Sequence, residues 1–292
     1  MPLTAYTPTL SVDPGVRKYF EQTVEYWDQI YTGHRFVNWH MAHRRQLVID
    51  AVRCRSNGLP LKVLDLGCGS GVLTRDLLKM GHSVTALDCS ENMIRTLMHY
   101  QGGRSEPGFL GAAIGSAGEV CLKSGAFDLI LCVGVIQYQR DPQIVLKEIC
   151  RLLKPGGACV FTLPNQLSLH HLLDPWCFAR YIYRLAIERC RNREAWPGSC
   201  RAALVSAAYT DDVYEKRYFR RDIPALVKGL IMRETISFGY GPFTIANKPL
   251  LPDRISIALS TAFTKLSRLQ PLSWLSTFAN RWVVVLEKPC SS

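Results

Sequence analysis

The stretch VLDLGCGSG, from Val63 to Gly71, carries the strongest chemical signal in the sequence. Glycines stand at three alternate positions, Gly67, Gly69 and Gly71, directly after an apolar run. A glycine-rich turn between a strand and a helix exposes backbone N–H groups and lets a nucleotide approach closely. The pattern therefore predicts a nucleotide-binding loop, although a tight turn without a ligand would also produce a lone match.

Two aspartates narrow the choice of ligand. Asp88 ends the next predicted strand, where a carboxylate can accept hydrogen bonds from both hydroxyl groups of a ribose. Asp65 lies just before Gly67, where it would repel a pyrophosphate and attract a cation. A dinucleotide loop would need glycine at Val72, and a P-loop would need a Gly-Lys-Ser/Thr sequence. We therefore expect a nucleoside-containing cofactor with a positive charge.

The elements around this loop alternate between strands and helices. Apolar runs bounded by turn residues predict five strands, at 62–66, 83–88, 108–115, 127–135 and 158–164. Apolar residues at helical spacing predict the helices between them, at 72–80, 91–100 and 143–153. This alternation is typical of an α/β fold, a mostly parallel sheet with helices on both faces.

The flanking segments interrupt this alternation. Further helices are predicted at 19–31, 42–54 and 220–230, and the last two strands at 232–238 and 281–289. We interpret residues 1–292 as one domain with insertions where α/β enzymes build substrate pockets. Its parts are a helical N-terminal segment (1–58), a cofactor-binding core (61–164) and insertions after the fifth and sixth strands (165–215 and 240–279).

The composition limits compartment and partners. The net charge of +11 suits an acidic ligand, an anionic membrane face or nucleic acid, and equally a solvated basic surface without a partner. The cysteines contain no C-x-x-C pair, so neither a metal nor dithiol chemistry is predicted. The chain opens without an apolar segment of signal-peptide type and has no apolar run of about 18 residues. With unpaired cysteines, these features predict a cytoplasmic protein.

Together the motifs resemble those of class I S-adenosylmethionine-dependent methyltransferases. VLDLGCGSG resembles their first motif, LDCSENMI (87–94) their acidic motif after the second strand, and RLLKPGG (151–157) the turn before the fifth strand. The resemblance covers about residues 62–164. It implies a Rossmann-like sheet of seven strands with the last antiparallel, and S-adenosyl-L-methionine as the cofactor.

The resemblance also implies cofactor-binding roles. Asp88 would hold the ribose, Met93 would pack on the adenine, and Ser116 and Ala117 would contact the adenine. Family members commonly have aspartate at the position of Ser116, so we expect a weaker or water-mediated hydrogen bond there. YWDQIY (26–31) is similar to the lid of small-molecule methyltransferases, including those of ubiquinone and magnesium-porphyrin synthesis, although a helix packed on the sheet would show the same aromatic spacing. The predicted set is Tyr31, Asp65, Gly67, Cys68, Gly69, Gly71, Asp88, Cys89, Met93, Ser116, Ala117 and Val133.

Methyl transfer from a sulfonium is an in-line displacement that depends mainly on positioning. A hydroxyl acceptor also gains from a general base. Candidate bases follow the predicted fourth and fifth strands, at Tyr138, His170 and His171. The two adjacent histidines could equally flank a helix start in a structural role.

Two basic amphipathic segments, 174–193 and 253–269, bear on the acceptor. The second predicts a helix with an apolar stripe of Ile255, Leu259, Ala262, Phe263, Leu266 and Leu269. Such helices suit peripheral membrane contact, the roof of a pocket for an anionic substrate, or packing on the sheet with a solvated basic face. GVIQY (134–138) lacks the proline pair of nucleobase-methylating enzymes, which disfavours nucleic acid. We expect a small hydrophobic or aromatic acceptor, lipid-like or carboxylated, methylated on oxygen rather than nitrogen or carbon.

Two other functions stay open from the sequence. One is a Rossmann-type oxidoreductase that binds NAD(P), which Asp65 and Val72 disfavour. The other is a non-catalytic protein of the same fold that associates with membranes, which would explain the basic helices and Ser116.

Overall fold

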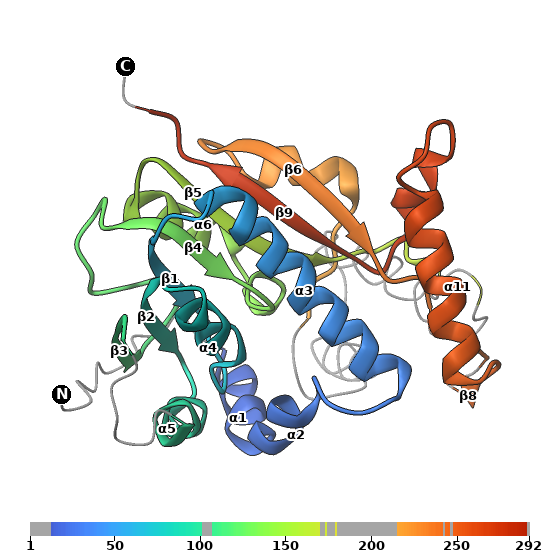
Figure 1. The fold of residues 1–292 in the computed structure, drawn as a ribbon, viewed down its shortest axis with the longest axis horizontal. Helices are drawn as coiled ribbons and strands as arrows, with labels where there is room; N and C mark the ends of the chain where they lie inside the picture. The colour runs from blue at the N-terminus through green and yellow to red at the C-terminus, as the bar shows by residue number, and fades with distance from the viewer. Residues whose placement is uncertain are drawn as a thin grey trace, which may run out of the picture.

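A seven-stranded sheet forms the centre of the molecule (Figure 1). The computed structural model describes residues 13–100, 107–169, 215–241, 243–245 and 248–290, with the single positions 173 and 179. The strand order is β3-β2-β1-β4-β5-β9-β6. Their bounds are β1 (Lys62–Leu66), β2 (Ser83–Asp88), β3 (Phe109–Ile114), β4 (Phe127–Cys132), β5 (Leu153–Pro164), β6 (Ile231–Phe238) and β9 (Arg281–Glu287). β1 to β5 pair in parallel, and β9 runs antiparallel to β5 and β6, so the predicted fold class is confirmed.

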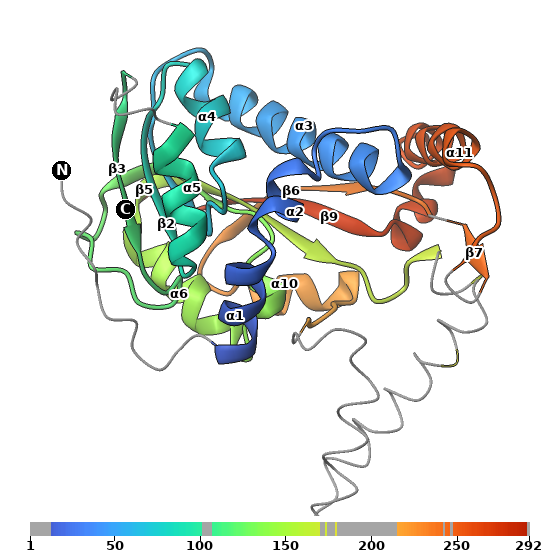
Figure 2. The same ribbon diagram turned by 90° about the horizontal axis from the view of Figure 1, so that it is seen from below.

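Helices cover both faces of the sheet (Figure 2). They are α1 (Pro14–Gln22), α2 (Val24–Gln29), α3 (Phe36–Ser56), α4 (Val72–Lys79), α5 (Glu91–Tyr100), α6 (Pro142–Leu152), α10 (Ile223–Leu226) and α11 (Asp253–Leu266). Successive strand residues point to opposite faces: Val63 packs with α3 and α4, whereas Leu64 packs with α6 and α10. The remaining elements are the 3₁₀ turns η1 (Ile136–Tyr138), η2 (Arg220–Asp222) and η3 (Leu272–Phe278), and the hairpin β7 (Thr244–Ile245) with β8 (Lys248–Pro249).

Polar side chains cap the N-termini of α5 and α6 and stabilise the loops that lead into these helices. The hydroxyl of Ser90 accepts the backbone N–H of Met93 at 3.2 Å and caps α5. The carboxylate of Asp141 accepts the N–H of Gln143 at 3.0 Å and caps α6, whose first residue is proline. A polar side chain at this position satisfies an N–H group that has no partner within the helix. Both caps follow directly from the sequence.

Two predicted helices differ in the structure. The segment 220–230 forms only η2 and the four-residue α10, because Gly229 at φ +86° turns the chain away. The predicted helix at 19–31 is divided into α1 and α2 at Thr23, whose hydroxyl donates to the carbonyl of Tyr19 at 2.7 Å. Such a bond back to the preceding turn competes with continuation of the helix.

α11 buries a different face from the one that its apolar stripe suggests. It packs against α3, and its buried residues are a row of small hydroxyl residues, Ser256, Ser260 and Thr264. Ser260 accepts the backbone N–H of Tyr240 at 2.8 Å. The stripe residues Ile255, Leu259, Leu266 and Leu269 are exposed instead. α11 therefore packs on the sheet domain with its basic residues exposed, which is one of the three predicted arrangements, but it does not bury its apolar stripe.

Candidate functional site

A cavity lies between the carboxyl ends of the central strands and helices α1, α2 and α3. Its walls contain ten of the predicted cofactor-binding residues, Tyr31, Asp65, Gly67, Cys68, Gly69, Asp88, Cys89, Met93, Ala117 and Val133. The candidate base Tyr138 also lines it, as do Phe20 of α1 and Trp27 of α2. The fold therefore brings residues from distant parts of the sequence into one site.

Glycine is needed at Gly67 and at Gly69 for different reasons. Both adopt positive φ, with +81° at Gly67 and +54° at Gly69. A Cβ atom on Gly67 would overlap the side chain of Val135, so packing within the fold requires this glycine. A Cβ atom on Gly69 would meet only the sulfur of Met93, at 3.9 Å. The bare backbone of Gly69 therefore keeps space free inside the cavity.

The carboxylate of Asp88 is held at the rim of the loop. One oxygen accepts the backbone N–H of Gly69 at 2.9 Å, and the other accepts that of Ser90 at 2.9 Å. Burial raises the pKa of Asp88, while these two hydrogen bonds oppose that shift. Each carboxylate oxygen has a further lone pair, so the geometry leaves room for the ribose hydroxyl groups that the sequence predicts at this position.

Asp65 lies deeper, at the end of β1. It is 1% exposed, and one of its oxygens accepts a hydrogen bond from the hydroxyl of Thr74 at 2.6 Å. Burial, with a contribution from the charge of Asp88, raises the pKa of Asp65 to about 6. A buried carboxylate of this kind is stabilised by a cationic ligand.

Two of the predicted residues, Gly71 and Ser116, do not line the cavity in the described structure. Gly71 packs against Leu97 instead. Ser116 is buried outside the cavity wall, and its hydroxyl accepts the backbone N–H of Gly118 at 3.2 Å within a turn. His170 and His171 lie outside the described residues, and their role stays a prediction.

Tyr138 ends the turn η1 beside the cavity. Burial, followed by the charge of Glu215, raises the pKa of Tyr138 to about 12. A phenol with this pKa is protonated at neutral pH, so it can donate a hydrogen bond but is a poor general base. The structure therefore favours a role for Tyr138 in orienting a ligand.

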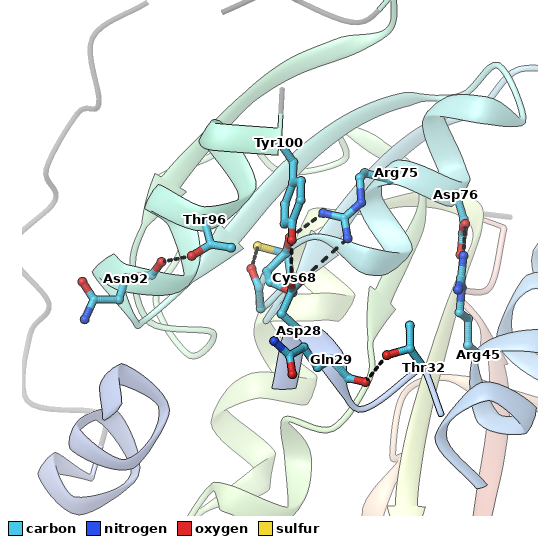
Figure 3. A network of polar contacts seen from close by, with 12 residues as sticks. Asp28, Gln29, Thr32, Arg45, Cys68, Arg75, Asp76, Asn92, Thr96 and Tyr100 are labelled. Carbon is cyan, nitrogen blue, oxygen red and sulfur yellow. Dashed lines mark hydrogen bonds and ion pairs between the residues drawn. The ribbon is translucent and has the colours of Figure 1, made fainter. Parts of the chain in front are cut away.

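Charged contacts fasten the N-terminal helices to the core (Figure 3). Asp28 accepts a hydrogen bond from the hydroxyl of Tyr100 and lies 3.9 Å from the guanidinium of Arg75. That guanidinium also stacks on the ring of Tyr100, 4.3 Å from its centre. Arg45 of α3 forms a bidentate pair with Asp76 of α4, with both distances 2.5 Å. These contacts hold α2, with its aromatic residue Trp27, and α3 beside the cavity.

Two arginines of the cavity wall were not predicted. Arg44 is buried on α3 and donates to the hydroxyl of Tyr31 at 2.8 Å, while its Nε has no hydrogen-bond partner in the described part of the chain. Arg281, the first residue of β9, also lines the cavity. In the sequence both belong to ordinary basic segments, and only the packing of α3 and β9 turns them inward. Nothing in the sequence alone indicates in which direction these two side chains point.

Comparisons with known proteins decide the family. A family model described as a methyltransferase domain matches residues 64–161. The ubiquinone biosynthesis O-methyltransferase of Caulobacter vibrioides is 32% identical over 189 residues, which cover 61% of this chain and 73% of that protein. The chain belongs to the class I S-adenosylmethionine-dependent methyltransferases. The oxidoreductase alternative is therefore wrong, and S-adenosylmethionine is the methyl donor.

A further relative and a solved structure are also similar to this chain. The ubiquinone biosynthesis O-methyltransferase of Psychrobacter cryohalolentis is 27% identical over 188 residues, covering 60% of this methyltransferase and 73% of that protein. The magnesium protoporphyrin IX methyltransferase of Synechocystis, solved with bound S-adenosylhomocysteine, aligns with a TM-score of 0.55 at 13% identity. That alignment covers 94% of this chain and 98% of the other, and shows the shared fold.

The cavity of the methyltransferase fits its cofactor at several points. The open space at Gly69 beside Met93 suits the nucleoside, with Asp88 placed for the ribose. Asp65 offers a buried negative charge for the ammonium group of the methionine portion. The unpartnered Nε of Arg44 suits its carboxylate. We therefore expect Asp88, Asp65 and Arg44 to hold the two polar ends of the cofactor.

Cofactor affinity should fall at acidic pH because of Asp65. Burial raises the pKa of Asp65 from 3.8 to about 6. Below pH 6 the carboxylate of Asp65 is therefore protonated, and the ammonium group of the ligand must displace that proton in order to bind. S-adenosylhomocysteine should bind about tenfold more weakly for each pH unit below 6. Titration calorimetry across this range would measure the slope, with Asp65→Asn as the comparison. An equally steep slope in Asp65→Asn would assign the effect to another group.

Proposed function

We propose that the enzyme transfers the methyl group to an oxygen atom of a small hydrophobic or aromatic acceptor. An aromatic wall inside the cavity carries this proposal. The ring of Phe20 lies 5.2 Å from that of Tyr138 and 5.8 Å from that of Trp27, measured between ring centres. Such a wall suits a flat apolar molecule. The names of the relatives, O-methyltransferases of ubiquinone biosynthesis, support oxygen as the accepting atom.

The residues of the cavity would act by positioning. When bound, S-adenosylmethionine supplies a methyl group on a positively charged sulfur. The aromatic wall would hold the acceptor in a fixed plane, and the protonated hydroxyl of Tyr138 would donate a hydrogen bond that orients it. Helices α1 and α2 would limit the access of water. Such positioning accounts for much of the rate of a displacement that needs no covalent intermediate.

A panel of matched acceptors tests this function. Para-hydroxybenzoate and para-aminobenzoate, each with a hexyl chain beside the nucleophile, differ in the accepting atom. We expect the wild type to release S-adenosylhomocysteine and an O-methylated product from the phenol, and to leave the aniline unmethylated. Mass spectrometry identifies the products, and Asp88→Ala is the control for a trace contaminant. Faster methylation of the aniline would contradict the proposal.

We also propose that α11 brings the enzyme into peripheral contact with anionic membranes. Four large apolar side chains around it are well exposed: Leu250 at 60%, Ile255 at 47%, Leu269 at 56% and Trp274 at 59%. Arg254, Lys265 and Arg268 are exposed on the same helix and the turn after it. Apolar side chains beside basic ones bind the interface of anionic lipid bilayers. Within the described ranges, no helix is long and apolar enough to cross a membrane.

Substitution of the apolar stripe tests the membrane contact. The double variant Ile255→Ser/Leu259→Ser should reduce sedimentation with phosphatidylserine-containing vesicles several-fold, because each substitution removes buried apolar area from the lipid contact. The control Leu59→Ser/Leu110→Ser removes two side chains elsewhere that are more exposed than Ile255 and Leu259, and it should sediment like the wild type. Equal sedimentation of the two double variants would contradict the proposal, and gel filtration would show whether a second copy covers the stripe instead.

A further inference from the structure

One of the charged side chains in the cavity wall has no counterpart on the cofactor. Four charged side chains line the cavity: Asp65, Asp88, Arg44 and Arg281. The aspartates suit the ribose and the ammonium group of the cofactor, and Arg44 suits the single carboxylate of that molecule. Arg281 then has no counterpart on the cofactor. A buried charge without a partner is costly, so this guanidinium requires a group that neutralises it.

Within the protein Arg281 is only partly neutralised. Its side chain is 18% exposed, and Nη2 lies 3.4 Å from Glu215. Glu215 also pairs with Arg217, at 3.3 Å. Among the described residues, Glu215 is the carboxylate that forms an ion pair with Arg281, so two guanidinium groups share one negative charge. A positive charge therefore remains beside the cavity.

The free donors of Arg281 point to a ligand rather than to the fold. Its Nη1 is buried and has no hydrogen-bond partner in the described structure. The side-chain oxygen of Gln137, which lines the same cavity, is also buried and unpartnered there. Buried donors and acceptors are normally satisfied, and those of a binding site are satisfied when the ligand arrives. A guanidinium offers parallel N–H groups that match a carboxylate.

The position of Arg281 in the sheet places its guanidinium at the end of the cavity away from Asp65 and Asp88, where the methyl acceptor would lie. Arg281 pairs in the sheet with Pro164 of β5 and Phe238 of β6, so it lies on the opposite side of β4 from β1 and β2. Asp65 and Asp88 end β1 and β2. The charges of Arg281 and Arg44 both lower the pKa of Tyr138, and all three residues line the same cavity. We propose that Arg281 binds a carboxylate of the methyl acceptor and makes the enzyme selective for acidic aromatic acceptors, an inference that rests on the proposed function.

Binding and turnover together test this role. The probes are hexyl-substituted para-hydroxybenzoate and para-hydroxybenzamide, which have the same shape and differ in charge. With S-adenosylhomocysteine present, calorimetry should show that the wild type binds the acid at least tenfold more tightly than the amide. Arg281→Gln should abolish this preference by weakening the binding of the acid alone. Arg281→Lys should keep part of the preference, because the charge remains but the paired N–H donors are lost. S-adenosylhomocysteine affinity should be unchanged in both variants.

Arg233→Gln is the matched control, since Arg233 is exposed on β6, pairs with Glu287 and is absent from the cavity wall. It removes the same charge and should keep the preference for the acid. Equal binding of the acid and the amide by the wild type would overturn the role of Arg281. Loss of S-adenosylhomocysteine affinity in Arg281→Gln would also overturn it, because Arg281 would then bind the carboxylate of the cofactor. If the acid binds selectively but is not methylated on oxygen, the proposed function fails while the carboxylate site stands.

Discussion

Replacement of Asp88 by alanine should weaken the binding of S-adenosylhomocysteine by about 1–3 kcal/mol, or roughly 5- to 150-fold in affinity. The carboxylate of Asp88 holds the N–H groups of Gly69 and Ser90 at the rim of the loop. Its removal leaves the ribose hydroxyl groups without an acceptor and releases the loop from its anchor. Titration calorimetry at neutral pH measures the change directly.

Asp128→Ala is the control for Asp88→Ala. Asp128 likewise accepts a backbone N–H, that of Lys62 at 2.9 Å, but at the opposite end of β1. It also pairs with Lys154 at 2.6 Å, so the variant removes a comparable set of contacts. The control should lower the melting temperature without changing the affinity for S-adenosylhomocysteine. Unchanged affinity in Asp88→Ala would show that the ribose is held elsewhere.

Gly69→Asn should abolish measurable cofactor binding while the protein stays folded. Gly69 lies at φ +54°, a conformation that asparagine tolerates better than most residues. A Cβ atom there would meet only Met93, so the new side chain would occupy the space kept free for the cofactor. We expect a loss of more than about a hundredfold in affinity, the scale expected when a side chain fills part of a preformed pocket.

Gly58→Asn provides the comparison for Gly69→Asn. Gly58 lies at φ +78°, and nothing lies within 4 Å of the Cβ position. The two variants should have similar melting temperatures, since both introduce asparagine in the left-handed region. Only Gly69→Asn should lose S-adenosylhomocysteine. Retained binding in that variant would mean that the cofactor does not pass over the glycine loop.

The core of the site was predictable because its signals are local. A strand, a glycine turn, a helix and a second strand ending in Asp88 follow one another in the sequence, and parallel topology brings the strand ends together. Caps such as Asp141 are local as well. These features depend on neighbours within a few residues, so one sequence was enough to place Asp65, Gly69 and Asp88 in a common cavity.

The features that were missed depend on packing between distant segments. Arg281 could have faced solvent from the start of β9, and only the cavity beside it shows its inward direction. For α11, the apolar stripe containing Leu259 is exposed, and the face containing the small residue Ser260 is buried instead. The hydroxyl of Ser116 satisfies a turn rather than lining the cavity. In each case the sequence allows two orientations, and contacts far along the chain select one.

A crystal structure of the enzyme with S-adenosylhomocysteine and hexyl-substituted para-hydroxybenzoate would test the account most directly. We predict the ribose on Asp88, the amino group of the cofactor beside Asp65, and the carboxylate of the acceptor on Arg281. The phenol oxygen should face the sulfur atom in line for methyl transfer. A ribose bound away from Asp88, or an acceptor whose phenol oxygen is turned away from the sulfur, would contradict the account.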